Sequence, residues 1–243
     1  MTSDLVDHLA KVHEYGKTDF RWLNLRKLVK KYVIGKSILD AGCGTGHMTL
    51  ELLNDGYEVT AIDISQELVD FTKRIIKENN YRGEVHVLDL ANAKVLGENK
   101  FDTIVCLDVL EHIRDDELAI KNLYYILKKN GHLIVSVPAL RFLYGIRDKK
   151  IGHFRRYSKK ELIKKLKNSG FQIVEIRYWN FLGVLPFLFS EKVLHSEVYE
   201  EIRYSKESFF SKFLNFLLDK WFFYIENNIR FPIGLSLIVI CKK

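Results

Sequence analysis

The hydrophobic and polar positions of this 243-residue chain change period several times along its length. After residue 36, short apolar runs alternate with longer segments in which apolar side chains recur every three or four positions. The short runs are typical of buried strands, and the longer segments are typical of amphipathic helices. Strands that alternate with helices predict an α/β fold, with a parallel sheet covered by helices on both faces.

The pattern also sets the boundaries that we expect. Two helices precede the sheet, and two serines mark later helix starts: Ser65, and Ser158 with Glu161 as a capping box. A helix that starts at Asp115 or Asp116 should stop at Asn130-Gly131. The predicted helices are 4–15, 19–33, 48–54, 65–79, 115–130 and 158–170, and the predicted strands are 37–40, 57–62, one beginning at Phe101, 132–137, 171–179 and 235–241.

The connection over residues 180–234 is unusually long and rich in Phe, Tyr and Trp. No repeat or low-complexity linker separates it from its surroundings, so we interpret it as an insertion in a single domain. That domain comprises N-terminal helices (1–35), a core (36–179), the insertion and a final strand (235–243).

A helix over residues 209–225 of the insertion would be amphipathic. Its apolar face would carry Phe210, Phe213, Leu214, Leu217, Leu218, Trp221 and Ile225, and its polar side Ser208, Lys212, Asn215 and Asp219. One interpretation is a helical subdomain that packs on the sheet or on a second copy. The other is a lid or membrane-surface helix that receives a lipidic acceptor.

The strand at residues 37–40 runs directly into three alternating glycines, Gly42, Gly44 and Gly46. Glycine lets backbone lie against a ligand and adopt positive φ, and the N–H groups that start the next helix would face the same ligand. Asp63 closes the second strand, where its carboxylate can accept both hydroxyls of a ribose. A dinucleotide fold prefers G-x-G-x-x-G, but His47 stands at the last position. The spacing therefore favours a nucleoside without a pyrophosphate and leaves a nicotinamide-binding oxidoreductase as the rival.

With these glycines, Asp63, Asp89 and the stretch 101–113, the chain resembles the class I S-adenosylmethionine-dependent methyltransferases over residues 36–138. The resemblance implies a Rossmann-like seven-stranded sheet of order 3-2-1-4-5-7-6 with strand 7 antiparallel. It also implies S-adenosylmethionine as cofactor and S-adenosylhomocysteine as product. The cofactor positions that it implies are Asp40, Gly42, Cys43, Gly44, Asp63, Ile64, Asp89, Leu90 and Leu107.

The same resemblance implies a role for each of several carboxylates. Asp40 would take the amino group of the methionine moiety, and Asp63 the ribose hydroxyls with Ile64 under the adenine. Asp89 would accept from the adenine amino group.

A hydroxyl acceptor needs a base, because it becomes nucleophilic only as its proton leaves. His112 ends the fourth-strand motif, and His153 lies in the long loop after strand five. Either histidine is a candidate base, and either can instead make a structural hydrogen bond. Arg155, Arg156 and Tyr157 would hold a phosphate or carboxylate of the acceptor, or the arginines would simply pair with acidic residues.

A second, looser resemblance covers residues 138–144, 152–157 and 20–27, and it is to methyltransferases associated with cell-surface glycan and lipid biosynthesis. It indicates O-methylation of a small-molecule, lipid-linked or glycan-type acceptor. The alternatives are an RNA or protein methyltransferase. No convergent metal ligands are identified, so no metal is expected.

The net charge limits the classes of partner that the protein can have, and the cysteine content indicates its cellular compartment. The net charge of +7 suits nucleic acid, anionic lipid or a phosphorylated substrate, although no RNA-binding module accompanies it and nucleic acid is the less favoured partner. The three cysteines form no C-x-x-C pair, and neither a signal peptide nor a long apolar run is present. We therefore expect a cytoplasmic protein, either soluble or peripheral at a membrane.

Overall fold

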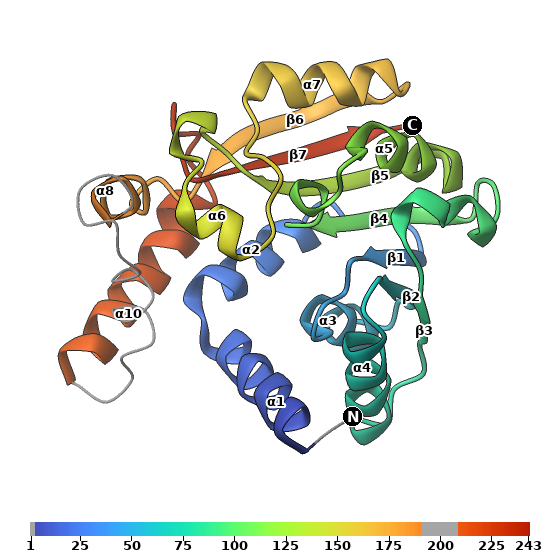
Figure 1. The fold of residues 1–243 in the computed structure, drawn as a ribbon, viewed down its shortest axis with the longest axis horizontal. Helices are drawn as coiled ribbons and strands as arrows, with labels where there is room; N and C mark the ends of the chain where they lie inside the picture. Colours follow the sequence, from blue (N-terminus) through green and yellow to red (C-terminus); the bar gives the residue numbers. More distant parts are fainter. Residues whose placement is uncertain (1–2, 191–208) are drawn as a thin grey trace.

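The computed structural model describes residues 3–190 and 209–243, and its centre is a seven-stranded sheet of order β3-β2-β1-β4-β5-β7-β6 (Figure 1). Neighbouring strands are parallel except that β7 runs antiparallel to both β5 and β6. The predicted sheet order and the antiparallel seventh strand are therefore confirmed. The strands are β1 (Ser37–Ala41), β2 (Glu58–Asp63), β3 (Glu84–Val87), β4 (Phe101–Leu107), β5 (Leu127–Pro138), β6 (Gln172–Trp179) and β7 (Ser236–Lys242).

Helices bury their apolar sides against both faces of this sheet. One face is covered by η1 (Leu90–Leu96), α5 (Asp116–Ile126) and α7 (Lys159–Asn168). The other is covered by α2 (Phe20–Lys30), α3 (His47–Asn54) and α4 (Gln66–Glu78), while α1 (Ser3–Thr18) packs against α2, α3 and α4. Ser65 and Ser158 begin α4 and α7 as predicted, since each hydroxyl accepts a backbone N–H of the first turn.

The largest error in a predicted helix boundary concerns the helix after Asp115. The helix after Asp115 ends at Ile126 and not at Asn130, and β5 begins at Leu127. Leu127 is fully buried and pairs with Phe101. The Asn130-Gly131 pair, where Asn130 has a φ of 65°, accompanies the register shift before His132 pairs with Thr103. A left-handed residue therefore marks an irregularity inside a strand and not a helix end.

The described part of the insertion adds α8 (Val184–Phe189), α10 (Phe209–Trp221) and the single π-turn η5 (Phe222–Glu226). These elements lie at one end of the sheet together with η2 (Leu110–His112), η3 (Arg141–Leu143) and α6 (Ile146–Lys150) (Figure 1). Within the described ranges, no helix combines the length and the apolar character that a membrane crossing requires.

The predicted face of α10 is only partly right. Leu214 and Leu218 line a pocket together with the supposedly outward Asn215, and Asp219 accepts a hydrogen bond from buried Asn24 of α2. Phe213 and Leu217 are about half exposed instead, at 51% and 47%. Helix α10 contacts α2, and buried Asn24 of α2 needs a hydrogen-bond partner. The Asp219 side of α10 therefore faces α2, and the helix is turned about its axis relative to the predicted orientation. Ser208 lies outside the described residues.

Candidate functional site

The three alternating glycines form the turn between β1 and α3, and each has a positive φ, of 86° at Gly42, 53° at Gly44 and 79° at Gly46. The turn is fixed to β2, because the N–H groups of Gly42 and Cys43 both donate to the carbonyl of Ile62. A Cβ added at Gly44 would have no protein atom within 4 Å. The loop therefore presents open backbone to the space in front of it.

Two carboxylates flank this loop. Asp63 accepts the N–H of Gly44 at 2.9 Å and that of Ser65 at 3.0 Å, and it remains partly exposed. Asp40 is buried and accepts the Thr49 hydroxyl at 2.6 Å. Burial raises the pKa of Asp40 to about 6, despite the Thr49 hydrogen bond, and nearby Asp63 adds to the rise.

The space before the loop is a crevice of about 780 Å³, which we call the glycine-loop crevice. Every residue that the sequence analysis assigns to cofactor binding lines it, since Ile64, Asp89, Leu90 and Leu107 join the loop and its two carboxylates. Ile64 is 70% exposed and offers an apolar surface. Asp89 caps η1 through the N–H of Ala91. A cavity of this size holds a nucleoside-sized ligand.

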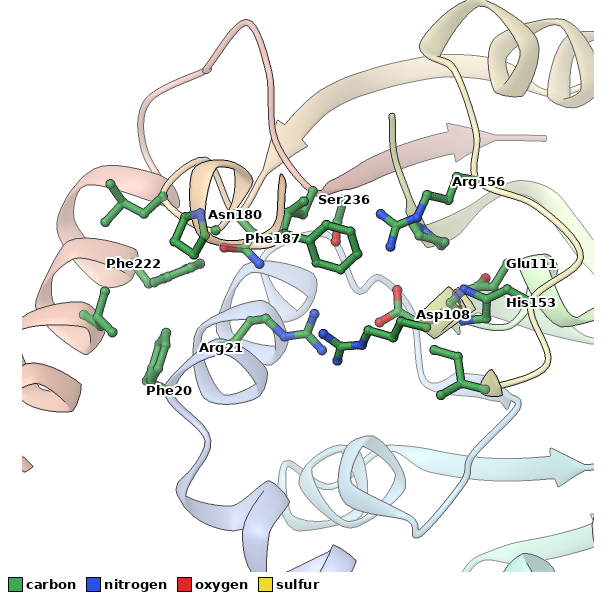
Figure 2. Close-up of a pocket in the computed structure, with 18 of the residues that line it drawn as sticks. Phe20, Arg21, Asp108, Glu111, His153, Arg156, Asn180, Phe187, Phe222 and Ser236 are labelled. Atoms are coloured by element: carbon green, nitrogen blue, oxygen red, sulfur yellow. Dashed lines mark ion pairs between the residues drawn. The ribbon is translucent and has the colours of Figure 1, made fainter. Parts of the chain in front are cut away.

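A second cavity of about 560 Å³ lies between the carboxyl end of the sheet and the insertion, and we call it the aromatic pocket (Figure 2). Its apolar lining includes Phe20, Phe187, Leu214, Leu218 and Phe222. Its ionisable lining is formed by Arg21, Asp108, Glu111, His112, Arg147, His153 and Arg156, and Arg156 stacks on Phe187. Asp108 and His112 line both cavities, so the two cavities adjoin at the end of β4.

His153 is oriented by a buried carboxylate. Its Nδ1 lies 2.9 Å from Oδ1 of Asp148, whose other oxygen accepts Nε of Arg156 at 2.8 Å. Burial raises the pKa of Asp148, but the hydrogen bonds from His153 and Arg156 outweigh it and leave that pKa lowered. Asp148 is thus a charged acceptor for Nδ1–H, and Nε2 of His153 lies 3.8 Å from Oε1 of Glu111 on the pocket side.

His112 packs edge-on against His153, with the ring centroids 4.6 Å apart. Burial, and then the neighbouring His153, lower the pKa of His112, which favours its neutral form. Both predicted histidines therefore lie together at the junction of the two cavities.

Glu111 lies beside them and is fully buried, and its Oε2 has no hydrogen-bond partner among the described residues. Burial, reinforced by Asp108, raises its pKa well above the usual value. Within the described part of the chain, Glu111, His112 and His153 place potential ligand atoms within 4.8 Å of one another. This donor set suits a divalent transition metal, and the expectation of no metal stays a prediction.

The three predicted acceptor residues lie in different environments, and both arginines pair with carboxylates, as the alternative interpretation expects. Tyr157 is fully buried, and its hydroxyl contacts the Leu110 carbonyl and the Asp116 carboxylate. Arg155 pairs with Asp116 at 2.9 Å and donates to the Arg114 carbonyl, so it serves the packing of α5. Arg156 does line the aromatic pocket, but its guanidinium is held by Asp148 and the Ala139 carbonyl.

Four further residues at or beside the aromatic pocket were not predicted from the sequence, namely Arg21, Asp108, Glu111 and Asp148. Asp108 has a φ of 53°, an uncommon conformation for a residue with a side chain, and its carboxylate accepts the Ser136 hydroxyl. Its position directly after β4 could have revealed it. Asp148 carries no such signal, because only the loop conformation brings it to His153.

Comparison with known proteins identifies the family. The family model described as "Methyltransferase domain" matches residues 7–176, which include the glycine loop, both histidines and Asp148. The chain belongs to this methyltransferase family. The predicted resemblance is thereby confirmed.

Relatives of this methyltransferase domain include the ubiquinone biosynthesis O-methyltransferase of Xanthomonas euvesicatoria, which is 27% identical over 155 residues. That match covers 58% of this chain and 65% of the relative. The enzyme of the same name from Rickettsia akari is 33% identical over 99 residues, or 41% of this chain and 39% of the relative. The chain thus spans less than two thirds of the length of these relatives.

Solved structures agree on the fold. A SAM-dependent methyltransferase from Archaeoglobus fulgidus superposes with a TM-score of 0.60 at 20% identity. The superposition covers 96% of this chain and 99% of the other. At this identity the likeness confirms the Rossmann-like methyltransferase fold and nothing finer.

Proposed function

We propose that the protein is an S-adenosylmethionine-dependent methyltransferase that acts on a hydroxyl of a small-molecule acceptor with an apolar part. The observation that carries the proposal is the junction at Asp108 and His112. There the glycine-loop crevice, which suits a nucleoside, opens beside a pocket that contains an oriented histidine. The related ubiquinone biosynthesis O-methyltransferases support a hydroxyl as the methylated group.

The residues that line the crevice fit the cofactor. Asp63, already placed by Gly44 and Ser65, would hold the ribose, and Asp40 the ammonium of the methionine moiety. Ile64 and Leu90 would lie against the adenine beside Asp89. When bound, S-adenosylmethionine supplies an electrophilic methyl group.

The chain's own contribution is to position the acceptor and to take its proton. A hydroxyl in the aromatic pocket would face Nε2 of His153, whose other nitrogen is held by Asp148. The apolar lining would hold the apolar part of the acceptor and so help to align its hydroxyl with the methyl donor. His112 completes the surface between the two cavities.

Ligand preference tests the proposal directly. Titration calorimetry should show tight binding of S-adenosylhomocysteine and none of NAD. Radiolabelled S-adenosylmethionine should methylate an alkylated catechol but not its dimethyl ether, because the ether has no hydroxyl. NAD binding without S-adenosylhomocysteine binding would mean an oxidoreductase instead.

The pH dependence of cofactor binding should follow Asp40. Its pKa of about 6 in the free protein lies above the usual value of 3.8, so it is largely protonated below pH 6. Binding an ammonium there must expel that proton, so the Kd for S-adenosylhomocysteine should rise about tenfold per pH unit below 6 and stay flat above it. Asp40→Asn should bind more weakly and without this slope. An unchanged slope in Asp40→Asn would assign it to another group.

The exposed side of α10 and η5 supports a further proposal, that the protein contacts membranes and accepts lipid-linked substrates. Phe213, Phe216, Leu217, Phe223 and Tyr224 are all exposed there. Lys220 lies 5.3 Å from the Phe216 ring, and Lys27 5.1 Å from Phe223. An apolar surface bordered by lysines suits an anionic bilayer, and α10 also lines the aromatic pocket.

Vesicle sedimentation checks this contact. Phe213→Ser with Leu217→Ser should lower binding to phosphatidylglycerol vesicles at least tenfold, because each inserted side chain contributes about 1.5–3 kcal/mol. Val174→Ser on β6 removes an equally exposed apolar side chain and should change nothing. Equal vesicle binding by the double variant and the wild type would refute the contact.

A further inference from the structure

Arg21 is held at the first turn of α2 in a way that directs its side chain into the aromatic pocket. The Asp19 carboxylate caps the helix by accepting the N–H groups of Arg21 and Trp22, at 2.9 and 3.4 Å. With the backbone fixed, the side chain of Arg21 extends between Phe20 and Phe222 on one side and Asp108 on the other (Figure 2).

The guanidinium of Arg21 lacks the partners that a partly buried arginine normally has. Its Nε is buried with no hydrogen-bond acceptor, and no ion pair within 4.0 Å joins it to any residue of the described ranges. The guanidinium carbon lies 5.6 Å from the centroid of the Trp22 ring, within range of a cation–π contact. Arg21 is partly buried, and a buried Nε–H without an acceptor is costly, so the arrangement favours a ligand that supplies an anionic acceptor.

Two other arginines near the cavities contrast with it. Arg156 is held by Asp148 and stacks on Phe187, and Arg26 pairs with Glu51 at 2.9 Å. The charge of each is therefore paired with a carboxylate of the chain. The charge of Arg21 is presented to the pocket, and its planar fork can hold two oxygens of one anionic group.

The surroundings of Arg21 restrict the rest of such a ligand. Phe20, Phe222, Leu214 and Leu218 form an apolar wall beside the guanidinium. His153 lies on the opposite side of the same pocket, with Asp108 between (Figure 2). A ligand that spans the pocket would place an anion at Arg21, an apolar segment along the wall and its reacting group near His153.

We propose that Arg21 is the anion-binding subsite for an amphipathic acceptor that bears a carboxylate or phosphate next to an apolar segment. The inference rests on the proposed function, because it treats the aromatic pocket as the acceptor site. It names the substrate class that this pocket selects.

Short alkyl probes test the subsite without any methyl transfer. Octanoate, octyl phosphate and uncharged octanamide would be titrated calorimetrically into the protein saturated with S-adenosylhomocysteine. At least one anion should bind about tenfold or more tightly than octanamide, since charge-assisted bonds to a guanidinium are strong. The preferred anion tells a carboxylate acceptor from a phosphate one.

Arg21→Gln should abolish the preference for the anion, and Arg21→Lys should keep part of it. Arg230→Gln is the matched control, because Arg230 is exposed and is not among the residues that line the pocket, and it should behave as wild type. An anion preference that survives Arg21→Gln would overturn the subsite. So would a loss of S-adenosylhomocysteine affinity in Arg21→Gln, which would assign Arg21 to the cofactor carboxylate. If wild-type protein binds no S-adenosylhomocysteine at all, the proposed function fails instead.

Discussion

Gly44→Val should weaken binding of S-adenosylhomocysteine at least about 100-fold, while Gly56→Val should leave it unchanged. Both glycines have a positive φ, 53° and 83°, and neither would bring an added Cβ within 4 Å of another protein atom. Valine should therefore strain both turns to a similar extent, roughly 1–3 kcal/mol. The two variants differ in what lies in front of them, since only Gly44 borders the glycine-loop crevice.

Calorimetric titration gives the affinities, and thermal unfolding gives the stability of each variant. Matched losses of stability with a selective loss of affinity would locate the effect in the crevice. Equal affinities in the two variants would mean that the ligand does not approach the backbone at Gly44, and the nucleoside interpretation of the loop would be wrong.

The glycine loop could be predicted because its cause is local. A turn that needs positive φ at three alternate positions demands glycine, and the apolar runs on either side fix the strand and the helix. The order of the strands in the sheet was predicted from the resemblance to the methyltransferase family, because hydrophobic periodicity alone does not determine strand order. The prediction that a helix ends at Asn130-Gly131 was wrong. Leu127 pairs with Phe101 of β4, and this strand pairing outweighed the local capping signal.

The acceptor side was harder to predict because it is assembled from distant segments. Arg21 comes from an N-terminal helix, Phe187 and Leu214 from the insertion, and His153 from the loop after β5. Neighbouring residues have different environments there. Arg156 lines the aromatic pocket, while Tyr157 is buried against α5. Nothing in the run Arg155-Arg156-Tyr157 distinguishes these environments, because they depend on the position of Asp116 and Asp148 in three dimensions.

The second large effect concerns His153. His153→Ala should lower kcat for methyl transfer about 100-fold or more, which is the usual contribution of a positioned general base. The Kd for S-adenosylhomocysteine should change little, because His153 lines the aromatic pocket but not the glycine-loop crevice. His86→Ala removes an exposed histidine from β3 and should retain full activity.

The partner of His153 sharpens the test. Asp148→Asn keeps the size of the side chain but loses the charge that holds Nδ1–H, so the pH at which activity is half-maximal should shift downward as the imidazolium becomes less stable. A merely structural histidine would lower stability and leave that profile in place. Equal losses of turnover and cofactor affinity in His153→Ala would also contradict the base.

Removal of metal ions by a chelator tests whether these residues transfer a proton or bind a metal. If Nε2 of His153 takes the proton, dialysis against EDTA should leave kcat unchanged, and His112→Ala should cost less than His153→Ala. If instead EDTA abolishes turnover and Mn²⁺ restores it, then Glu111, His112 and His153 act together as ligands, as their 4.8 Å spacing permits. The three single variants would then lose activity alike, because removing any one ligand opens the same site.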